Sequence, residues 1–116
     1  MSNEDVSFSK YGKAFQEGLA QLIIEDRPFC DQMEEVLDVS FFELKYLQVF
    51  VGKVFSYREK YNIHPTKKIF ASILRTELED SNEAMQKLVR DYFSRMLASR
   101  ITDEAYIKET SLDFCK

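Results

Sequence analysis

The spacing of apolar residues along the chain predicts helices over nearly its whole length. Apolar side chains recur at intervals of three and four, as at Tyr11, Phe15 and Leu19, and this interval is the period of one helix face. No segment alternates strictly between apolar and polar residues, as a half-buried strand does. We therefore expect an all-α, compact domain of six helices.

The breaks in this pattern occur at residues that end or begin helices. Pro28 cannot continue a first helix and suits the first turn of a second. Potential capping residues, or interruptions of the apolar pattern, mark the later boundaries at Asp38 or Ser40, 62–66, 80–82 and 101–103. The third helix, over 41–61, is apolar on most of its circumference and is expected to be central, with a close helix contact at Gly52.

The ends of the chain differ from its centre. Residues 1–9 begin with a polar, acidic run and are expected to form a disordered lead. Residues 10–100 would form the helical head domain. Residues 101–116 would begin the second arm of an antiparallel helical hairpin, because only a short break separates the fifth and sixth helices. No helix-ending residue follows in this arm, so we expect it to be truncated within a helix or linker.

Length and charge limit the classes of protein to which the chain can belong. Its 116 residues suit one domain. It carries 16 Lys and Arg against 20 Asp and Glu, and a net charge of -4 disfavours a dominant role in binding nucleic acid. No apolar run approaches the roughly 18 residues of a membrane span, and Cys30 and Cys115 lack metal-ligand spacing. We expect a cytoplasmic protein with reduced thiols and no membrane contact.

Candidate chemistry within the chain is sparse. Gly12, Gly18 and Gly52 form neither a phosphate-binding loop nor a dinucleotide motif. His64 is the only histidine and is interpreted as a loop residue before a proline. Paired carboxylates fall on polar helix faces, where they are normally solvated. We therefore expect no catalytic residue, metal site or cofactor-binding site in this chain.

Two surfaces are candidates for binding a partner. One is basic and carries Lys67, Lys68 and Arg75, which form either a solvated helix start or a contact for an acidic partner or a passing nucleic-acid strand. The other is the expected hairpin, which either packs back onto the domain or supplies a self-association surface. Its candidate contact residues are Tyr92, Met96, Leu97, Tyr106, Leu112 and Phe114.

Short stretches of sequence point to one family. They are GLAQLIIED at 18–26, Phe29, Val36-Leu37, Phe41-Phe42 and, in the long third helix, Val49-Phe50. In this order and spacing they resemble the amino-terminal domain of DnaB-type replicative DNA helicases. Segments 57–66 (YREKYNIHPT) and 106–115 (YIKETSLDFC) are similar to the phage branch of that family. Ala20 and Gln48 depart from residues that are common in the family.

The resemblance implies a part in a larger machine. Helicases of this family form six-membered rings that move along single-stranded DNA, and their ATP and Mg²⁺ belong to a RecA-like motor domain outside these residues. Their amino-terminal domain pairs subunits and docks primase or a helicase loader. The chain would then be a non-catalytic assembly domain of a phage protein in the host cytoplasm, contacting DNA only through the parent ring.

Two other functions compete with this hypothesis. A stand-alone adaptor, such as a helicase loader or the helicase-binding domain of a primase, has a similar helical build. The alternative from another class is a small enzyme or a small DNA-binding protein, which the acidic charge balance disfavours.

Overall fold

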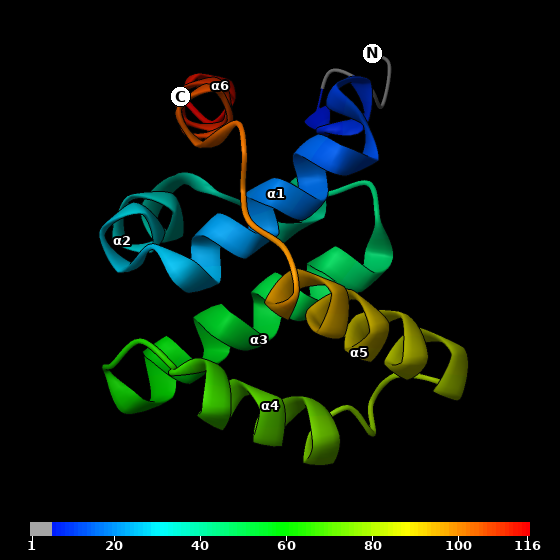
Figure 1. Cartoon of the computed structure of the whole chain (residues 1–116). Coiled ribbons are helices and arrows are strands. Elements are labelled where there is room, and N and C mark those ends of the chain that lie inside the picture. The colour runs from blue at the N-terminus through cyan, green and yellow to red at the C-terminus, as the bar shows by residue number, and fades with distance from the viewer. Residues whose placement is uncertain (1–5) are drawn as a thin grey trace.

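The computed structural model describes residues 6–116, and the regular structure within that range is entirely helical (Figure 1). The α-helices are α1 (Gly12–Glu25), α2 (Arg27–Val36), α3 (Lys45–Tyr61), α4 (Lys67–Thr76), α5 (Glu83–Leu97) and α6 (Glu104–Phe114). Two 3-10 turns, η2 (Ser9–Tyr11) and η3 (Val39–Phe41), accompany them. The prediction of an all-α protein with six helices is confirmed over the described range. None of these helices combines the length and apolar character that crossing a membrane requires.

Side-chain caps begin three of the helices. The Phe29 amide donates to the Asp26 carboxylate (3.0 Å), the Ile69 amide to the Thr66 hydroxyl (3.2 Å), and the Met85 amide to the Asn82 side chain (2.8 Å). These caps satisfy amides that have no partner within their own helix. The boundaries after residues 62–66 and 80–82 therefore agree with the sequence prediction.

The third helix begins later than predicted. Asp38 caps η3 instead of a long helix, and α3 starts only at Lys45. The fully buried Gln16 of α1 explains the delay, because its side-chain oxygen accepts hydrogen bonds from the amides of Glu43 (2.9 Å) and Leu44 (3.2 Å). These bonds fix the segment before α3 in a non-helical conformation.

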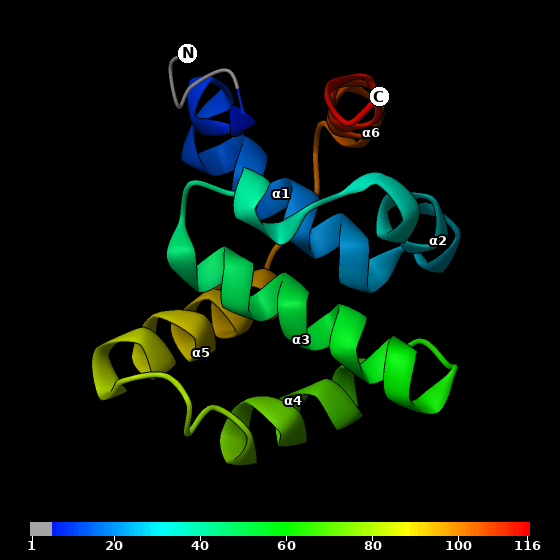
Figure 2. The same ribbon diagram turned by 180° about the vertical axis from the view of Figure 1, so that it is seen from behind.

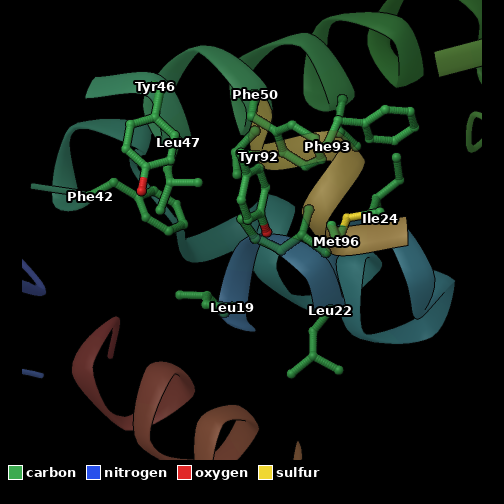
Figure 3. Close-up of a cluster of buried hydrophobic side chains, with 14 of the residues drawn as sticks. Leu19, Leu22, Ile24, Phe42, Tyr46, Leu47, Phe50, Tyr92, Phe93 and Met96 are labelled. Carbon is green, nitrogen blue, oxygen red and sulfur yellow. The ribbon is translucent and has the colours of Figure 1, made fainter. Parts of the chain in front are cut away.

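Helix α3 lies at the centre of the fold, as its apolar pattern predicts (Figures 1 and 2). The buried Phe50 ring contacts Phe70 of α4 and Tyr92 of α5, with ring centroids 5.0 Å apart in both pairs. Figure 3 shows side chains from α1, α3 and α5 meeting in this core. The close contact expected at Gly52 is wrong, because no atom of another element would lie within 4 Å of a Cβ there.

The residues before α1 belong partly to the folded structure. Phe8 is fully buried against Phe15, Phe42 and Phe114, and its amide donates to the Phe41 carbonyl (2.7 Å). The expectation of a disordered lead is therefore wrong for residues 6–9, since a single aromatic residue anchors them. Residues 1–5 lie outside the described range.

Helices α5 and α6 do not form the expected hairpin. Residues 98–103 cross over α1, and α6 packs against α1 and α2 on the side of α1 away from α3 (Figures 1 and 2). The contacts that hold it there include an ion pair between Lys108 and Asp26 and close packing of Ile107 on Gly18. A short connection produces a hairpin only when the second helix turns back onto the first. Here α6 packs on α1 instead of on α5.

Candidate docking site

A groove of about 520 Å³ lies over α1, between the carboxyl end of α5, the connection 98–103 and the start of α6. We call it the α1–α5–α6 groove. Its apolar lining includes Phe15, Met96, Ile101 and Ile107. The hollow exists because α6 is displaced from α5, so that one face of α1 remains partly uncovered between them.

Small residues on α1 shape the floor of the groove. Ala14 and Gly18 lie four residues apart, which places them on the same helix face. A Cβ atom at position 18 would lie 2.7 Å from Ile107 Cδ1, the end of that side chain, so a larger residue here would require the Ile107 side chain to shift. Gly18 therefore lets Ile107 pack closely on α1.

A polar network braces the α5 wall. The Glu17 carboxylate accepts hydrogen bonds from Arg95 Nη1 and Nη2 (both 2.9 Å) and from the Tyr46 hydroxyl (2.6 Å). The Tyr92 hydroxyl donates to the Glu17 carbonyl (2.5 Å). Glu17 of α1 thus forms hydrogen bonds with both α3 and α5 beside the groove.

The environment of Glu17 keeps its carboxylate charged. Burial alone would raise the pKa of Glu17, but the hydrogen bonds from Arg95 and Tyr46 outweigh it and hold the pKa below its usual value. Burial, reinforced by the bond to Glu17, raises the pKa of Tyr46 to about 12. Such a paired carboxylate and protonated phenol form a structural ion-pair network rather than an acid–base couple poised near neutral pH.

The buried side chain of Gln21 fastens the end of α5. Its amide nitrogen donates to the carbonyl oxygens of Ser99 (3.2 Å) and Met96 (3.4 Å) and to the Glu25 carboxylate (3.2 Å). The Met96 carbonyl, at the carboxyl end of α5, also accepts from the Ser99 amide (3.2 Å), so Gln21 adds to the bonds that the chain makes as it leaves the helix. They also direct the chain across α1 rather than back along α5.

The six predicted self-association residues do not form one surface. Tyr92 and Met96 line the groove but are almost fully buried, because their side chains complete the core. They are therefore unavailable as projecting contacts, which corrects the role expected for them. Tyr106 is 59% exposed and forms a wall of the groove, with its ring edge-on to Phe15 at 6.1 Å.

The other three members of that set lie elsewhere. Leu97 is 52% exposed but does not line the groove. Leu112 and Phe114 are partly buried against the core, and the Phe114 ring lies 4.7 Å from that of Phe8. Sequence reasoning missed Ala14 and Gly18, although two small residues four apart on an amphipathic helix are a recognisable signal for close helix approach.

The three predicted basic residues lie on α4, away from this groove. Lys67 is bound to the Glu25 carboxylate of α1 at 2.8 Å, so it is a structural contact between helices. Lys68 and Arg75 are exposed, and the described residues place no carboxylate within ion-pair distance of either. Only two of the three predicted basic residues are therefore available to a partner.

His64 connects three helices. Its Nδ1 lies 2.7 Å from Arg58 Nη1, and its Nε2 lies 2.7 Å from the Ile24 carbonyl at the end of α1. Arginine can only donate, so the network assigns the neutral tautomer in which Nδ1 accepts and Nε2 donates. Arg58 also pairs with Asp31 and Glu34 of α2. His64 thus lies in the loop before a proline, as its sequence context predicts, but its bonds to Arg58 and Ile24 were not predicted.

The remaining polar groups show no constellation for metal chemistry within residues 6–116, where no three His, Cys, Asp or Glu side chains converge. Cys30 and Cys115 are free thiols. Comparison of the chain with protein-family models, curated proteins and solved structures gave no match. The described residues thus form an all-helical domain with a partly apolar groove whose α5 wall is held by a hydrogen-bonded network.

Proposed function

We propose that this chain is a non-catalytic assembly and docking domain, and that a second copy of the chain occupies the α1–α5–α6 groove. The observation that carries the proposal is an exposed aromatic side chain, Tyr106, beside a hollow with an apolar floor. A projecting group next to a hollow is self-complementary under two-fold symmetry. Each Tyr106 ring would enter the groove of the other copy.

The rim of the groove suits the same arrangement. Arg100 and Asp103 are both exposed, line the groove and carry opposite charges. A two-fold axis that brings two such rims together can place each Arg100 opposite the other copy's Asp103. Rim charges of this kind fix the register of an interface more than they strengthen it. We therefore expect dimers or larger oligomers at micromolar or higher concentration.

Sedimentation velocity tests this surface with two matched substitutions. Tyr106→Asp places a carboxylate at the centre of the proposed interface and should abolish the concentration dependence of the sedimentation coefficient. Leu88→Asp changes a side chain of α5 that is 47% exposed and does not line the groove, so it should leave association unchanged. A monomer at millimolar concentration, or equal effects of both variants, contradicts the proposal.

We further propose that the domain serves a hexameric, ATP-dependent replicative helicase of the DnaB type from a phage. The support is the order of similar stretches from 18–26 to 106–115 together with the six-helix build. In this proposal the protein acts in the bacterial cytoplasm, and its collar docks primase or a helicase loader. ATP and Mg²⁺ belong to a motor domain outside this chain, and DNA is contacted only through the ring.

The genomic reading frame beyond Lys116 tests the helicase part separately. A downstream GxxxxGK[ST] sequence, the phosphate-binding loop of a motor domain, is the expected result. A stop codon directly after Lys116 would contradict it and would favour the stand-alone adaptor. Neither result depends on whether the α1–α5–α6 groove mediates self-association.

A further inference from the structure

A second groove, of about 340 Å³, lies between the carboxyl-terminal half of α3 and helix α4. We call it the α3–α4 groove. Residues 53, 56, 57, 60 and 61 of α3 line one side, and residues 69, 72, 73, 76 and 77 of α4 line the other. Both sets have the spacing i, i+3, i+4, i+7 and i+8, so each helix presents one continuous face. The groove runs along about two helical turns, roughly 12 Å.

The groove exists because α4 leans toward α5. Helix α4 packs on α5, and it meets α3 at the contact between the Phe70 and Phe50 rings. Beyond that contact the facing sides of α3 and α4 are only partly covered. Figure 2 shows α4 returning beneath α3 after the connecting loop, with α5 at the far end of the pair.

Apolar side chains gather at the loop end of this groove. Tyr61 is 55% exposed and stacks at 4.7 Å on Tyr57, while Ile69 faces them from α4. Ile63, in the connecting loop, is also strongly exposed. Three large exposed apolar residues at one end of a small domain form a patch of the kind that marks interaction sites.

The charge around the groove is opposite to that of the whole chain. Residues 52–77 contain six Lys and Arg and two Glu, although the net charge of the protein is -4. Arg58 and Lys67 are held in ion pairs, and Lys53 lies 3.8 Å from Asp80. The described residues place no carboxylate within ion-pair distance of Lys60, Lys68 or Arg75.

These uncommitted cations flank the apolar patch. Lys60 lines the groove, and its Nζ lies 5.3 Å from the centre of the Tyr61 ring. Lys68 precedes the lining residue Ser72 by four positions and Arg75 follows it by three, so both border Ser72 on the surface of α4 without lining the groove themselves. The groove therefore combines apolar contact area with positive charge along its rim.

We propose that the α3–α4 groove binds an acidic amphipathic segment of a different protein. Apolar side chains of that segment would pack on Tyr61 and Ile69, and its carboxylates would face Lys60, Lys68 and Arg75. This is the helix-in-groove mode of peptide recognition, with the charges setting orientation and partner choice. The site is separate from the α1–α5–α6 groove, so both can be occupied in one molecule.

A single-stranded nucleic acid fits these observations less well. Stable binding to phosphates usually draws on about six to ten basic contacts, and three uncommitted cations surround this groove. Glu77 lies in the lining and would repel a phosphate backbone. Tyr57 and Tyr61 offer aromatic faces on α3, but Ile69 faces them from α4 with an aliphatic side chain, which suits protein side chains better than base stacking.

Selection from a random library of displayed peptides of about 16 residues, which is four helical turns, tests the proposal on the full chain. We expect the enriched peptides to carry excess Asp and Glu, with bulky apolar residues three and four apart. The strongest peptide is then synthesised with a fluorescent label, and its affinity is measured by anisotropy. The double variant Lys60→Glu, Lys68→Glu should weaken binding about tenfold or more, because two attractive contacts become repulsive.

A peptide with reversed charge, a control variant and an oligothymidine strand make the outcome decisive. A peptide with its carboxylates replaced by lysines should bind the double variant better than the original chain. Lys45→Glu changes an exposed cation at the start of α3 that lines neither groove, and it should leave peptide affinity within about twofold. Neutral or basic enriched peptides, acidic peptides that bind the double variant unchanged, or tighter binding of an oligothymidine strand would each overturn the proposal.

Discussion

Helices α5 and α6 both contact α1, but α5 packs mainly on α3 and α6 packs mainly on α1 itself. The apolar face of α5 is buried in the core, and Tyr92, Arg95 and the α5 carboxyl end are hydrogen-bonded to Glu17 and Gln21. Helix α6 has two buried residues, Ile107 and Ser111, and a pairing of Lys108 with Asp26. The richer apolar pattern of α5 therefore marks core, whereas α6 keeps more of its side chains exposed.

The largest expected effect comes from placing a charge in the buried face of α5. Met96→Asp puts a carboxylate at a position that is 2% exposed, without a partner to neutralise it. We expect it to lower the free energy of unfolding by about 4 kcal/mol or more, measured by urea denaturation followed by circular dichroism. The adjacent Leu97→Asp lies on the exposed side and should cost less than about 1 kcal/mol. Similar costs for the two variants would contradict the assignment of α5 to the core.

A matched pair of glycine substitutions tests how closely α6 approaches α1. Alanine is favoured over glycine inside a helix by about 1 kcal/mol, and Gly52→Ala should gain this because no neighbouring element lies near its Cβ position. Gly18→Ala should gain nothing or lose stability, because the new Cβ meets Ile107 Cδ1. Amide hydrogen exchange should show faster exchange in α6, with α5 unchanged. Equal stabilisation by both variants would exclude a close contact at Gly18.

Acidification should weaken the contacts of α5 and of α6 with α1, because each contact depends on a carboxylate. The hydrogen bond and charge of Lys108 lower the pKa of Asp26, and the hydrogen bonds to Glu17 lower its pKa despite burial. A carboxyl group with a lowered pKa in the folded state stabilises the fold above its ordinary pKa of about 4 and loses that contribution as pH falls further. Stability should therefore fall below about pH 4.5.

Substitutions at the two carboxylates distinguish the contact with α5 from the contact with α6. Glu17→Gln should cost about 1 kcal/mol at neutral pH and flatten the acid dependence of unfolding, because its charged partner Arg95 is largely exposed. Asp26→Asn keeps a capping side chain but removes the charge that pairs with Lys108, so its smaller effect should be confined to exchange in α6. An unchanged acid dependence in Glu17→Gln would show that this carboxylate does not contribute.

The smallest effect concerns the two thiols. Burial raises the pKa of Cys30 in α2 to about 12 and that of Cys115, after α6, to about 11. Both are therefore protonated at pH 8 and should react slowly with an aromatic disulfide reagent, since the thiolate is the nucleophile. Cys115 should react faster than Cys30, because α6 is less firmly held, and urea should accelerate both. Faster reaction at Cys30 would reverse the comparison.

The local features of the fold could be predicted from the sequence. The helical period, Pro28 and the capping side chain of Thr66 act within a few residues, so the six helices followed from them. The errors arose from contacts between distant residues. Gln16 delays α3 by bonding amides 27 and 28 residues away, Phe8 anchors the first segment, and α6 packs on α1 instead of on α5.

The candidate site could be predicted only in part, for a related reason. An apolar face looks the same in sequence whether its neighbours in the fold cover it or leave it exposed. Tyr92 and Met96 were therefore assigned to a surface that the core occupies, whereas Tyr106 remains exposed beside the groove. The groove itself depends on the path of residues 98–103 across α1, which no local pattern encodes.

An NMR dilution series of the full chain, followed residue by residue, tests the central claim most directly. Amide and aromatic NMR shifts would be compared between micromolar and millimolar protein. The account predicts concentration-dependent shifts at Ala14, Gly18, Arg100 and Tyr106, lost in Tyr106→Asp but retained in Leu88→Asp. Spectra that do not change with concentration, or shifts that cluster on the α3–α4 groove instead, would contradict assembly through the α1–α5–α6 groove.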